Sequence, residues 1–218
     1  MKKALGILLF LIAFLFAFSS QRKYVTDAGA KELITNELSL YTSEPQIAIV
    51  NADYEKEGKA QVFHYILSNN DYAPYLYYGT AKIRSGRIIN AEEIRNSLKQ
   101  FESDIAATET LKQFLETGVS VPFRVFVTGN TEKEAEACLV LSEVFPAEEL
   151  QTTLQEYKTA QSIDTLFLNT LVVEDGDLVS HNLDVLGCFF PYYRENNELF
   201  HNDYMREKIA EAVRIEIR

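Results

Sequence analysis

The chain contains no tryptophan, two cysteines and three histidines, and it lacks the short motifs of the common catalytic and metal sites. It has no G-x-S-x-G, H-E-x-x-H, P-loop, G-x-G-x-x-G, C-x-x-C or EF-hand sequence. The absence of Trp also weakens a glycan-binding hypothesis, because Trp is the side chain most expected to stack on sugar rings. We therefore expect no cofactor and no metal, and a non-enzymatic protein is favoured over an enzyme.

One long apolar run is present, from Ala4 to Phe18, and it follows Lys2 and Lys3. A basic segment, an apolar segment and small residues in that order are typical of an export signal. Fifteen helical residues rise about 22 Å, which is short of the roughly 30 Å hydrocarbon core of a bilayer. The sequence therefore predicts a cleaved export signal over residues 1–20, with a short N-terminal anchor as the alternative. In both cases the remainder is expected to be exported, to the periplasm or outside the cell.

Acidic side chains outnumber basic ones, 32 to 21, and the net charge is −11 at pH 7. A charge of this sign repels nucleic acid phosphates and anionic lipid heads, so we expect no nucleic acid partner. Membrane contact is expected only through residues 4–18, if the signal is retained. The chain has no N-x-S/T sequon, which fits a bacterial envelope. An envelope protein or a peptide is the partner class that remains.

The two cysteines, Cys138 and Cys188, both have strongly apolar neighbours. In an oxidising compartment they form a candidate disulfide. Their surroundings equally suit two buried free thiols, so both interpretations stay open. A catalytic thiol is disfavoured, because apolar surroundings raise the thiol pKa.

After the export run, the sequence predicts a helix and then an antiparallel meander. Apolar residues recur at helical spacing over 24–41, with Asp27 as the expected N-cap. Three runs rich in β-branched and aromatic residues predict strands over 46–52, 60–67 and 75–83. A tight turn at Ser85-Gly86 is expected to follow.

A long helix is predicted next. Asn90 and Glu93 have the spacing of an N-cap and an acidic third helical residue, and apolar residues then follow at helical spacing. The helix is expected to continue or restart near Thr108 and to stop at Gly118. A short strand is predicted over 123–128.

The following segments mix helical and strand patterns. Thr131 and Glu134 match a capping box, which predicts a helix over 135–145. Residues 137–141 are apolar on all sides, so a strand is the alternative there. Pro146 fits the first turn of a further helix.

The C-terminal part predicts a hairpin. Asp175-Gly176 is a strong turn signal between the runs 165–173 and 178–186. The last residues, 213–217, suit either a strand or the end of a helix. No repeat or linker divides the chain, so we expect 21–218 to form a single α+β domain. Its expected architecture is antiparallel sheet segments, an N-terminal meander and a C-terminal hairpin, packed with several amphipathic helices.

Two tyrosine-rich clusters are the leading candidates for ligand or partner binding. The binding candidates are Tyr75, Tyr77 and Tyr78 in the first cluster, which also contains Tyr72, and Tyr192, Tyr193 and the nearby Arg194 in the second, which also contains Phe200 and Tyr204. Tyr combines apolar area with a polar tip, which suits a groove for a peptide or a partner protein. The alternative is that these aromatic residues complete a core or a cross-strand ladder.

The histidines and several acids are the candidates for chemistry. His64, His181 and His201 are the three imidazoles; His181 is near Asp184, and His201 is near Asp203. No third ligand accompanies either pair, so ordinary polar residues are favoured over a metal site. The acids Glu174, Asp175, Asp177 and Asp184 have the oxygen chemistry for Ca²⁺, but an exposed hairpin turn explains the first three without a metal.

The sequence thus favours an exported, non-enzymatic binding or interaction protein of a bacterial envelope. One alternative is an exported hydrolase that uses dispersed groups such as Asp175, Asp177 or Asp203 with His181 or His201. Another is a membrane-tethered assembly factor. An enzyme is expected to bring such groups together in a pocket, whereas a binding module is expected to present Tyr on an exposed face or a sheet edge.

Overall fold

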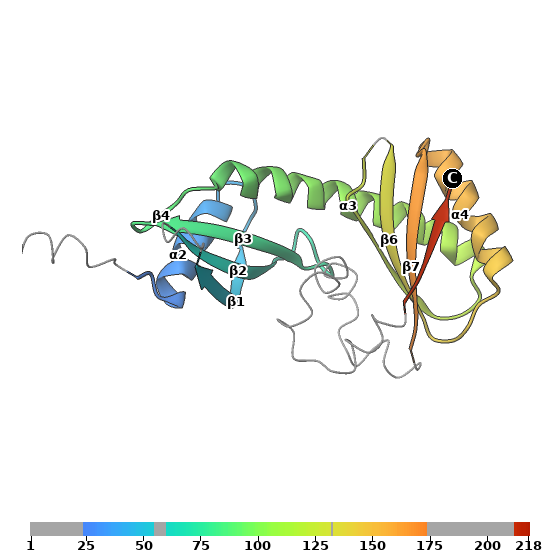
Figure 1. Ribbon diagram of the computed structural model, residues 1–218, viewed down its shortest axis with the longest axis horizontal. Helices are drawn as coiled ribbons and strands as arrows, with labels where there is room; N and C mark the ends of the chain where they lie inside the picture. The colour runs from blue at the N-terminus through green and yellow to red at the C-terminus, as the bar shows by residue number, and fades with distance from the viewer. Residues whose placement is uncertain (1–23, 55–59, 132, 174–211) are drawn as a thin grey trace, which may run out of the picture.

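The computed structural model describes residues 24–54, 60–131, 133–173 and 212–218. Within these ranges the chain forms three helices and eight strands, and the strands make two four-stranded sheets. The sheets lie towards opposite ends of one long helix (Figure 1). The α+β class predicted from the sequence is confirmed.

The N-terminal sheet is an antiparallel meander in the order β1-β2-β3-β4. Its strands are β1 (Gln46–Tyr54), β2 (Gln61–Ser68), β3 (Tyr77–Arg84) and β4 (Arg87–Ile88). Ser85 and Gly86 form the two-residue turn between β3 and β4, with φ of 52° and 73°. Positive φ at both positions matches the right-handed twist of the flanking strands, which explains the Gly. The predicted meander is confirmed.

Helix α2 (Asp27–Leu38) packs its apolar stripe of Ala30, Ile34 and Leu38 into the core beneath this sheet. Its N-cap is Thr26, whose hydroxyl accepts a hydrogen bond from the Gly29 N–H at 3.3 Å. The prediction of Asp27 as the cap is wrong by one residue. Asp27 instead lies in the first turn, where its charge favours the positive end of the helix.

Helix α3 (Ala91–Gly118) is a single continuous helix of 28 residues, about 42 Å long, and it does not restart at Thr108. Its first half contributes to the N-terminal core through Ile94, Leu98 and Phe101. Its second half contributes to the C-terminal core through Ala107, Leu111 and Leu115. One amphipathic stripe therefore serves two sheets. The helix ends at Gly118, as predicted.

The C-terminal sheet has the order β5-β6-β7-β8. Its strands are β5 (Phe123–Thr128), β6 (Glu134–Leu141), β7 (Thr165–Val172) and β8 (Val213–Ile217). Strands β6 and β7 are parallel and are joined through α4 (Ala147–Gln161), whereas the other two pairs are antiparallel. Of the predicted C-terminal hairpin, β7 is confirmed, and the second strand at 178–186 lies outside the described residues.

The predicted helix over 135–145 is wrong, because 134–141 forms β6. Ala135, Ala137 and Leu139 face the core under α3 and α4, while Cys138 and Val140 are buried on the opposite face. Burial on both faces makes residues 137–141 apolar at every position, so they lack the alternation that marks a half-buried strand. Thr131 and Glu134 bond each other in a turn before the strand instead of capping a helix.

Within the described residues, no helix is both long enough and apolar enough to cross a membrane. The candidate export signal over residues 1–20 lies outside those residues. Export and the single-domain organisation of 21–218 stay predictions.

Candidate functional site

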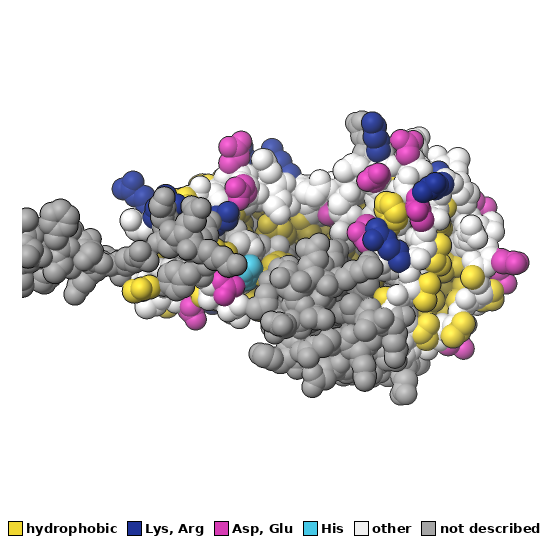
Figure 2. Space-filling view, viewed as in Figure 1, with side chains coloured by type: hydrophobic (Ala, Val, Ile, Leu, Met, Phe, Trp, Pro, Cys, Tyr) yellow, Lys and Arg dark blue, Asp and Glu magenta, His cyan; other side chains and the backbone are white. Residues whose placement is uncertain are grey.

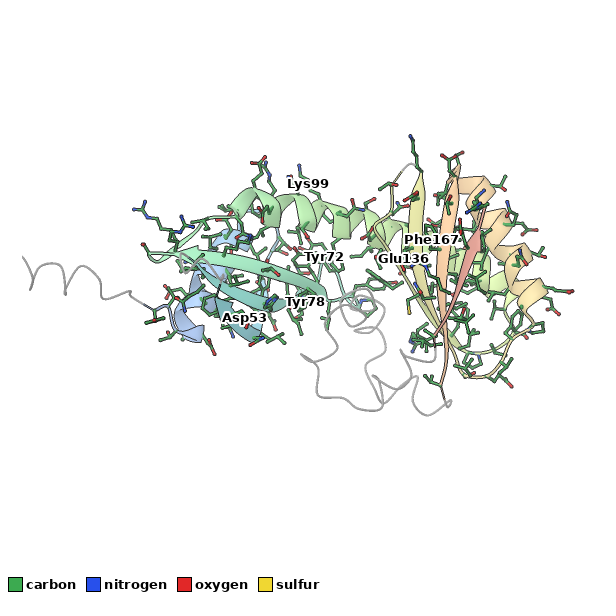
Figure 3. All side chains as sticks on the ribbon, viewed as in Figure 1. Asp53, Tyr72, Tyr78, Lys99, Glu136 and Phe167 are labelled. Carbon is green, nitrogen blue, oxygen red and sulfur yellow. The ribbon has the colours of Figure 1, made fainter. Side chains whose placement is uncertain are left out.

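The outer face of the N-terminal sheet holds a row of three polar side chains, one from each of β1, β2 and β3. His64 on β2 lies between Asp53 on β1 and Thr80 on β3. The His64 Nε2 atom is 3.5 Å from Asp53 Oδ2, and His64 Nδ1 is 3.3 Å from Thr80 Oγ1. The His64 ring also stacks on Tyr78, with ring centroids 5.9 Å apart. Figure 3 shows Asp53 and Tyr78 on the side of the sheet away from α3.

The position of the His64 proton follows from which neighbouring atoms can accept a hydrogen bond. The Asp53 carboxylate only accepts, so His64 Nε2 carries the proton and Nδ1 accepts from the Thr80 hydroxyl. Burial lowers the pKa of His64, and the neighbouring Asp53 carboxylate partly opposes that effect. With His64 neutral, the three side chains follow the order of a hydroxyl (Thr80), a base (His64) and an orienting carboxylate (Asp53).

A groove of about 270 Å³ runs between β3 and the start of α3. Its lining residues on β3 are Tyr77, Tyr78, Gly79, Thr80 and Lys82, and those on α3 and its N-cap are Asn90, Glu93, Ile94 and Ser97. The groove exists because β4 pairs with β3 only at Ile83 and Arg84. Beyond those residues, no described strand pairs with β3 on that side.

The side chain of Asn90 takes the place of a strand at one end of the groove. Its Oδ1 atom accepts from the Lys82 N–H at 2.8 Å, and its Nδ2 donates to the Thr80 carbonyl at 3.0 Å. One residue of a neighbouring parallel strand makes the same two bonds with its own C=O and N–H. Asn90 occupies the predicted N-cap position but makes no capping bond to α3, because its amide pairs with β3 instead.

The pairing of Asn90 also fixes the direction of the remaining main-chain groups of β3. Both groups of one strand residue point to the same edge, and successive residues alternate between edges. Since the Thr80 carbonyl points to Asn90, the Thr80 N–H points into the groove as well. The edge of β3 next to Asn90 is therefore oriented to receive an extended chain.

Of the first tyrosine cluster, the structure places Tyr75 and Tyr77 in the N-terminal core, at 8% and 4% exposure. Tyr75 lies before β3, not within it as predicted, and its hydroxyl donates to Glu109 on α3. Only Tyr78 is half-buried on the outer face. Core packing accounts for the other two, which leaves Tyr78 as the member with area to offer a partner.

The remaining predicted candidates divide between buried and undescribed positions. Cys138 is a buried free thiol on β6, and burial raises its pKa, which disfavours a nucleophile. The candidates outside the described residues are Tyr192, Tyr193, Arg194, Cys188, His181, His201, Glu174, Asp175, Asp177, Asp184 and Asp203. The disulfide therefore stays a prediction. Among the described residues, no group of three or more His, Cys, Asp or Glu side chains could hold a metal ion.

Sequence reasoning missed the partners of His64. Alternation in β2 puts Phe63, Tyr65 and Leu67 in the core and thus predicts that His64 faces outward. The register that sets it beside Asp53 and Thr80 is long-range and includes a bulge in β1 between Ile49 and Asn51. Short-range sequence patterns do not specify that register.

A wider depression of about 660 Å³ lies along α4. Its described lining consists of Glu148, Gln151, Thr152, Gln155, Glu156, Thr159 and Ala160, all from that one helix. It therefore brings no described groups from separate elements together. Figure 2 shows acidic and basic side chains interspersed on the visible face, so charge does not single out a second site there.

The fold defines this protein as an α+β protein in which one long helix joins a four-stranded meander to a mixed four-stranded sheet. No protein-family model, no curated protein and no solved structure shows a significant match to the chain.

Proposed function

We propose that this is an exported, non-enzymatic interaction protein of a bacterial envelope that binds an extended peptide segment of a partner protein along β3. The observation that carries the proposal is the Asn90 side chain, which pairs with β3 as a strand would at one end of an open groove. A bound peptide continues that pairing at the Thr80 N–H. Addition of a strand to a sheet edge is a recurring mode of peptide recognition.

The groove offers side-chain contacts in addition to main-chain pairing. The half-buried Tyr78 gives it apolar area, and Asn90, Ser97 and Thr80 give it polar groups from two elements. The groove thus presents both apolar area and placed polar groups to a ligand. Alternate side chains of an extended peptide then contact either α3 or solvent.

The test is an NMR titration of the ¹⁵N-labelled chain from residue 21 with acetyl-Val-Thr-Val-Thr-Val. We expect amide shifts centred on residues 78–82 and on the Asn90 side chain. The control peptide carries N-methyl groups on alternate residues, which removes the N–H groups that pair with a strand, and it is expected to bind at least tenfold more weakly. Shifts confined to other parts of the chain would contradict the proposal.

Export is the second part of the proposal, and it rests on the signal-like residues 1–20. Intact-mass analysis of the protein from the native envelope is expected to give a chain that begins near Gln21. A chain that still begins at Met1 supports the alternative of a membrane-tethered assembly factor.

An exported hydrolase is the second candidate, and the chain of Asp53, His64 and Thr80 is the observation that favours it. In that function Thr80 is the nucleophile and His64 is its base. Hydrolysis of p-nitrophenyl acetate separates the two functions. The hydrolase requires activity that Thr80→Val and His64→Gln each abolish, whereas the binding protein gives equal background hydrolysis with all three proteins.

A further inference from the structure

The side-chain amide of Asn90 takes the place of one residue of a parallel strand beside β3. It accepts from the Lys82 N–H and donates to the Thr80 carbonyl. In a parallel pair, a residue bonds in this way to the two residues that flank its direct partner on the other strand. The residue between Thr80 and Lys82 is Ala81, so the Asn90 amide fills the place opposite Ala81.

The Thr80 N–H is the main-chain donor that follows along this edge of β3. It points to the same side as the Thr80 carbonyl, which bonds Asn90. Thr80 lines the groove, and among the described strands none pairs with β3 at Thr80 on that side. A bound peptide therefore has to supply a carbonyl at this N–H.

The two possible directions of a bound peptide use Thr80 differently. In an antiparallel pair, one peptide residue opposite Thr80 bonds both its N–H and its carbonyl. The N–H of that residue would compete with Asn90 Nδ2, which already donates to the Thr80 carbonyl at 3.0 Å. In a parallel pair, the Thr80 N–H bonds a residue opposite Gly79, and the Thr80 carbonyl bonds the place that Asn90 fills. Only the parallel direction agrees with the contacts of Asn90.

We infer that the β3 groove binds the carboxyl-terminal segment of a partner polypeptide, which runs parallel to β3 towards Asn90. This inference rests on the proposed peptide-binding function and names the direction and the end of the peptide. A parallel peptide has room for one residue beyond the residue opposite Gly79, because Asn90 fills the following place. A longer chain would have to leave the groove at once, since α3 begins directly after Asn90. A chain that ends there avoids this turn.

The direction also assigns the side chains of the peptide. Directly opposite residues of two paired strands place their side chains on the same face of the sheet. Gly79 belongs to the core-facing set of β3, so the peptide residue opposite it points towards α3, where Ser97 lines the groove. The two neighbouring peptide residues lie on the outer face with Tyr78 and Thr80. Apolar side chains at these two positions are expected to contact the half-buried Tyr78 ring.

The direction of the peptide can be measured by NMR, because the two ends of the groove are well separated. Tyr77 lies at one end, where its ring contacts Phe101, and Lys82 lies at the other, where it bonds Asn90. Five residues of strand separate these ends by about 17 Å. The probe is acetyl-Val-Thr-Val-Thr-Val amide with a nitroxide at either end, added to the ¹⁵N-labelled chain from residue 21. We expect the C-terminal nitroxide to broaden the amide signals of Lys82 and Ala91, and the N-terminal nitroxide to broaden those of Tyr77 and Phe101.

A matched pair of peptides tests whether the chain ends at Asn90. Pro-Pro is appended to either the C-terminus or the N-terminus of the same peptide, so both products have one composition. Proline keeps the chain extended and has no N–H to pair with β3. The C-terminal Pro-Pro points at Asn90 and is expected to weaken binding at least fivefold. The N-terminal Pro-Pro points away from Asn90 and is expected to change binding less than twofold.

Asn90→Ala tests whether the Asn90 side chain sets the direction. Without its amide, the Thr80 carbonyl and the Lys82 N–H are open to a peptide in either direction, so each nitroxide is expected to broaden both ends of the groove. Asn96→Ala is the matched control, because Asn96 is exposed on the same helix, and it is expected to keep the wild-type pattern. If Asn90→Ala does not fold, the measurements on the wild-type chain still decide the inference.

The outcomes separate this inference from the proposed function. Binding on β3 with the two nitroxide patterns exchanged overturns the parallel direction and leaves peptide binding intact. Equal binding of the two Pro-Pro peptides, or an unchanged nitroxide pattern in Asn90→Ala, also overturns the inference alone. No shift on β3 with any of the peptides overturns both.

Discussion

Gly79 lines the groove and is also in contact with the N-terminal core. The space of its absent side chain is filled from two sides by the rings of Tyr65 and Tyr77. Both rings are nearly fully buried, so neither has solvent to move into. This close approach, rather than backbone conformation, is the reason for glycine here.

We expect Gly79→Ala to destabilise the fold by about 1–3 kcal/mol, because the added methyl group overpacks a filled core. The measurement is the urea midpoint at an unchanged m value. Gly79→Ala is expected to cost less when it is introduced into the Tyr65→Val variant, since the smaller side chain at position 65 leaves room for the methyl group. If the costs of the two changes simply add, the assigned contact is wrong.

His64 makes the stability depend on pH. Its pKa is lowered in the folded protein, so the unfolded chain binds a proton first as the pH falls through about 6.5. Stability from the neutral ring is complete above that pH and is lost as the pH falls towards the lowered value. We expect the difference in unfolding free energy between wild type and His64→Gln to shrink steadily below pH 6.5. A difference that is independent of pH contradicts this assignment.

At the scale of elements, α3 determines how the two sheets are held. Midway along it, Asp104 is buried, and its carboxylate accepts from the N–H groups of Gly129 and Asn130 at 3.2 and 2.9 Å. The Gln100 amide donates to the same carboxylate at 2.9 Å. Burial raises the pKa of Asp104, and these three hydrogen bonds oppose the rise. Asp104 thus fastens the β5-β6 turn to the middle of the helix.

Asp104→Ala is expected to destabilise the protein by about 3 kcal/mol, because it leaves two backbone N–H groups without their charged acceptor. Chemical denaturation measures the loss. The matched control is Ser103→Ala, since the adjacent hydroxyl makes one exposed contact of 3.4 Å with Asn130 and is expected to cost less than about 0.5 kcal/mol. Comparable losses for the two variants would show that the carboxylate has no special role.

The elements differ in how far the sequence predicts them. Helices α2, α3 and α4 were predictable because each buries one stripe and leaves the opposite face polar. Strand β6 was not predicted as the leading interpretation, because residues 137–141 are buried on both faces and their sequence has no alternation. A central strand is covered on both faces, and this burial is why the sequence of β6 did not indicate a strand.

At the scale of the whole molecule, the joint between the two sheets is aromatic. Phe101 on α3 contacts Phe126 on β5 at 6.1 Å between ring centroids, and it also contacts Tyr72 and Tyr77 at 5.5 and 5.3 Å. Tyr75 adds a contact with Phe126 at 5.5 Å. Phe126 belongs to the C-terminal sheet, yet it lies in the N-terminal core.

This joint predicts that residues 21–218 unfold as one cooperative unit. Phe101→Ala is expected to cost about 3–5 kcal/mol, because it removes a large ring from a packed site. It is also expected to shift a single transition, seen equally by tyrosine fluorescence and by circular dichroism. Two separated transitions, of which Phe101→Ala moves only one, would instead indicate two independent domains.

The sequence by itself determined the α+β class, the meander, the three helices and the turn at Ser85-Gly86, because each depends on periodicity or turn chemistry within a few residues. The tertiary structure alone decided that Asp53, His64 and Thr80 lie together, that the Asn90 side chain pairs with β3, and that Tyr65 reaches Gly79. These contacts depend on strand register and on where α3 starts beside the sheet. Both are set by packing over the whole core, which local patterns do not encode.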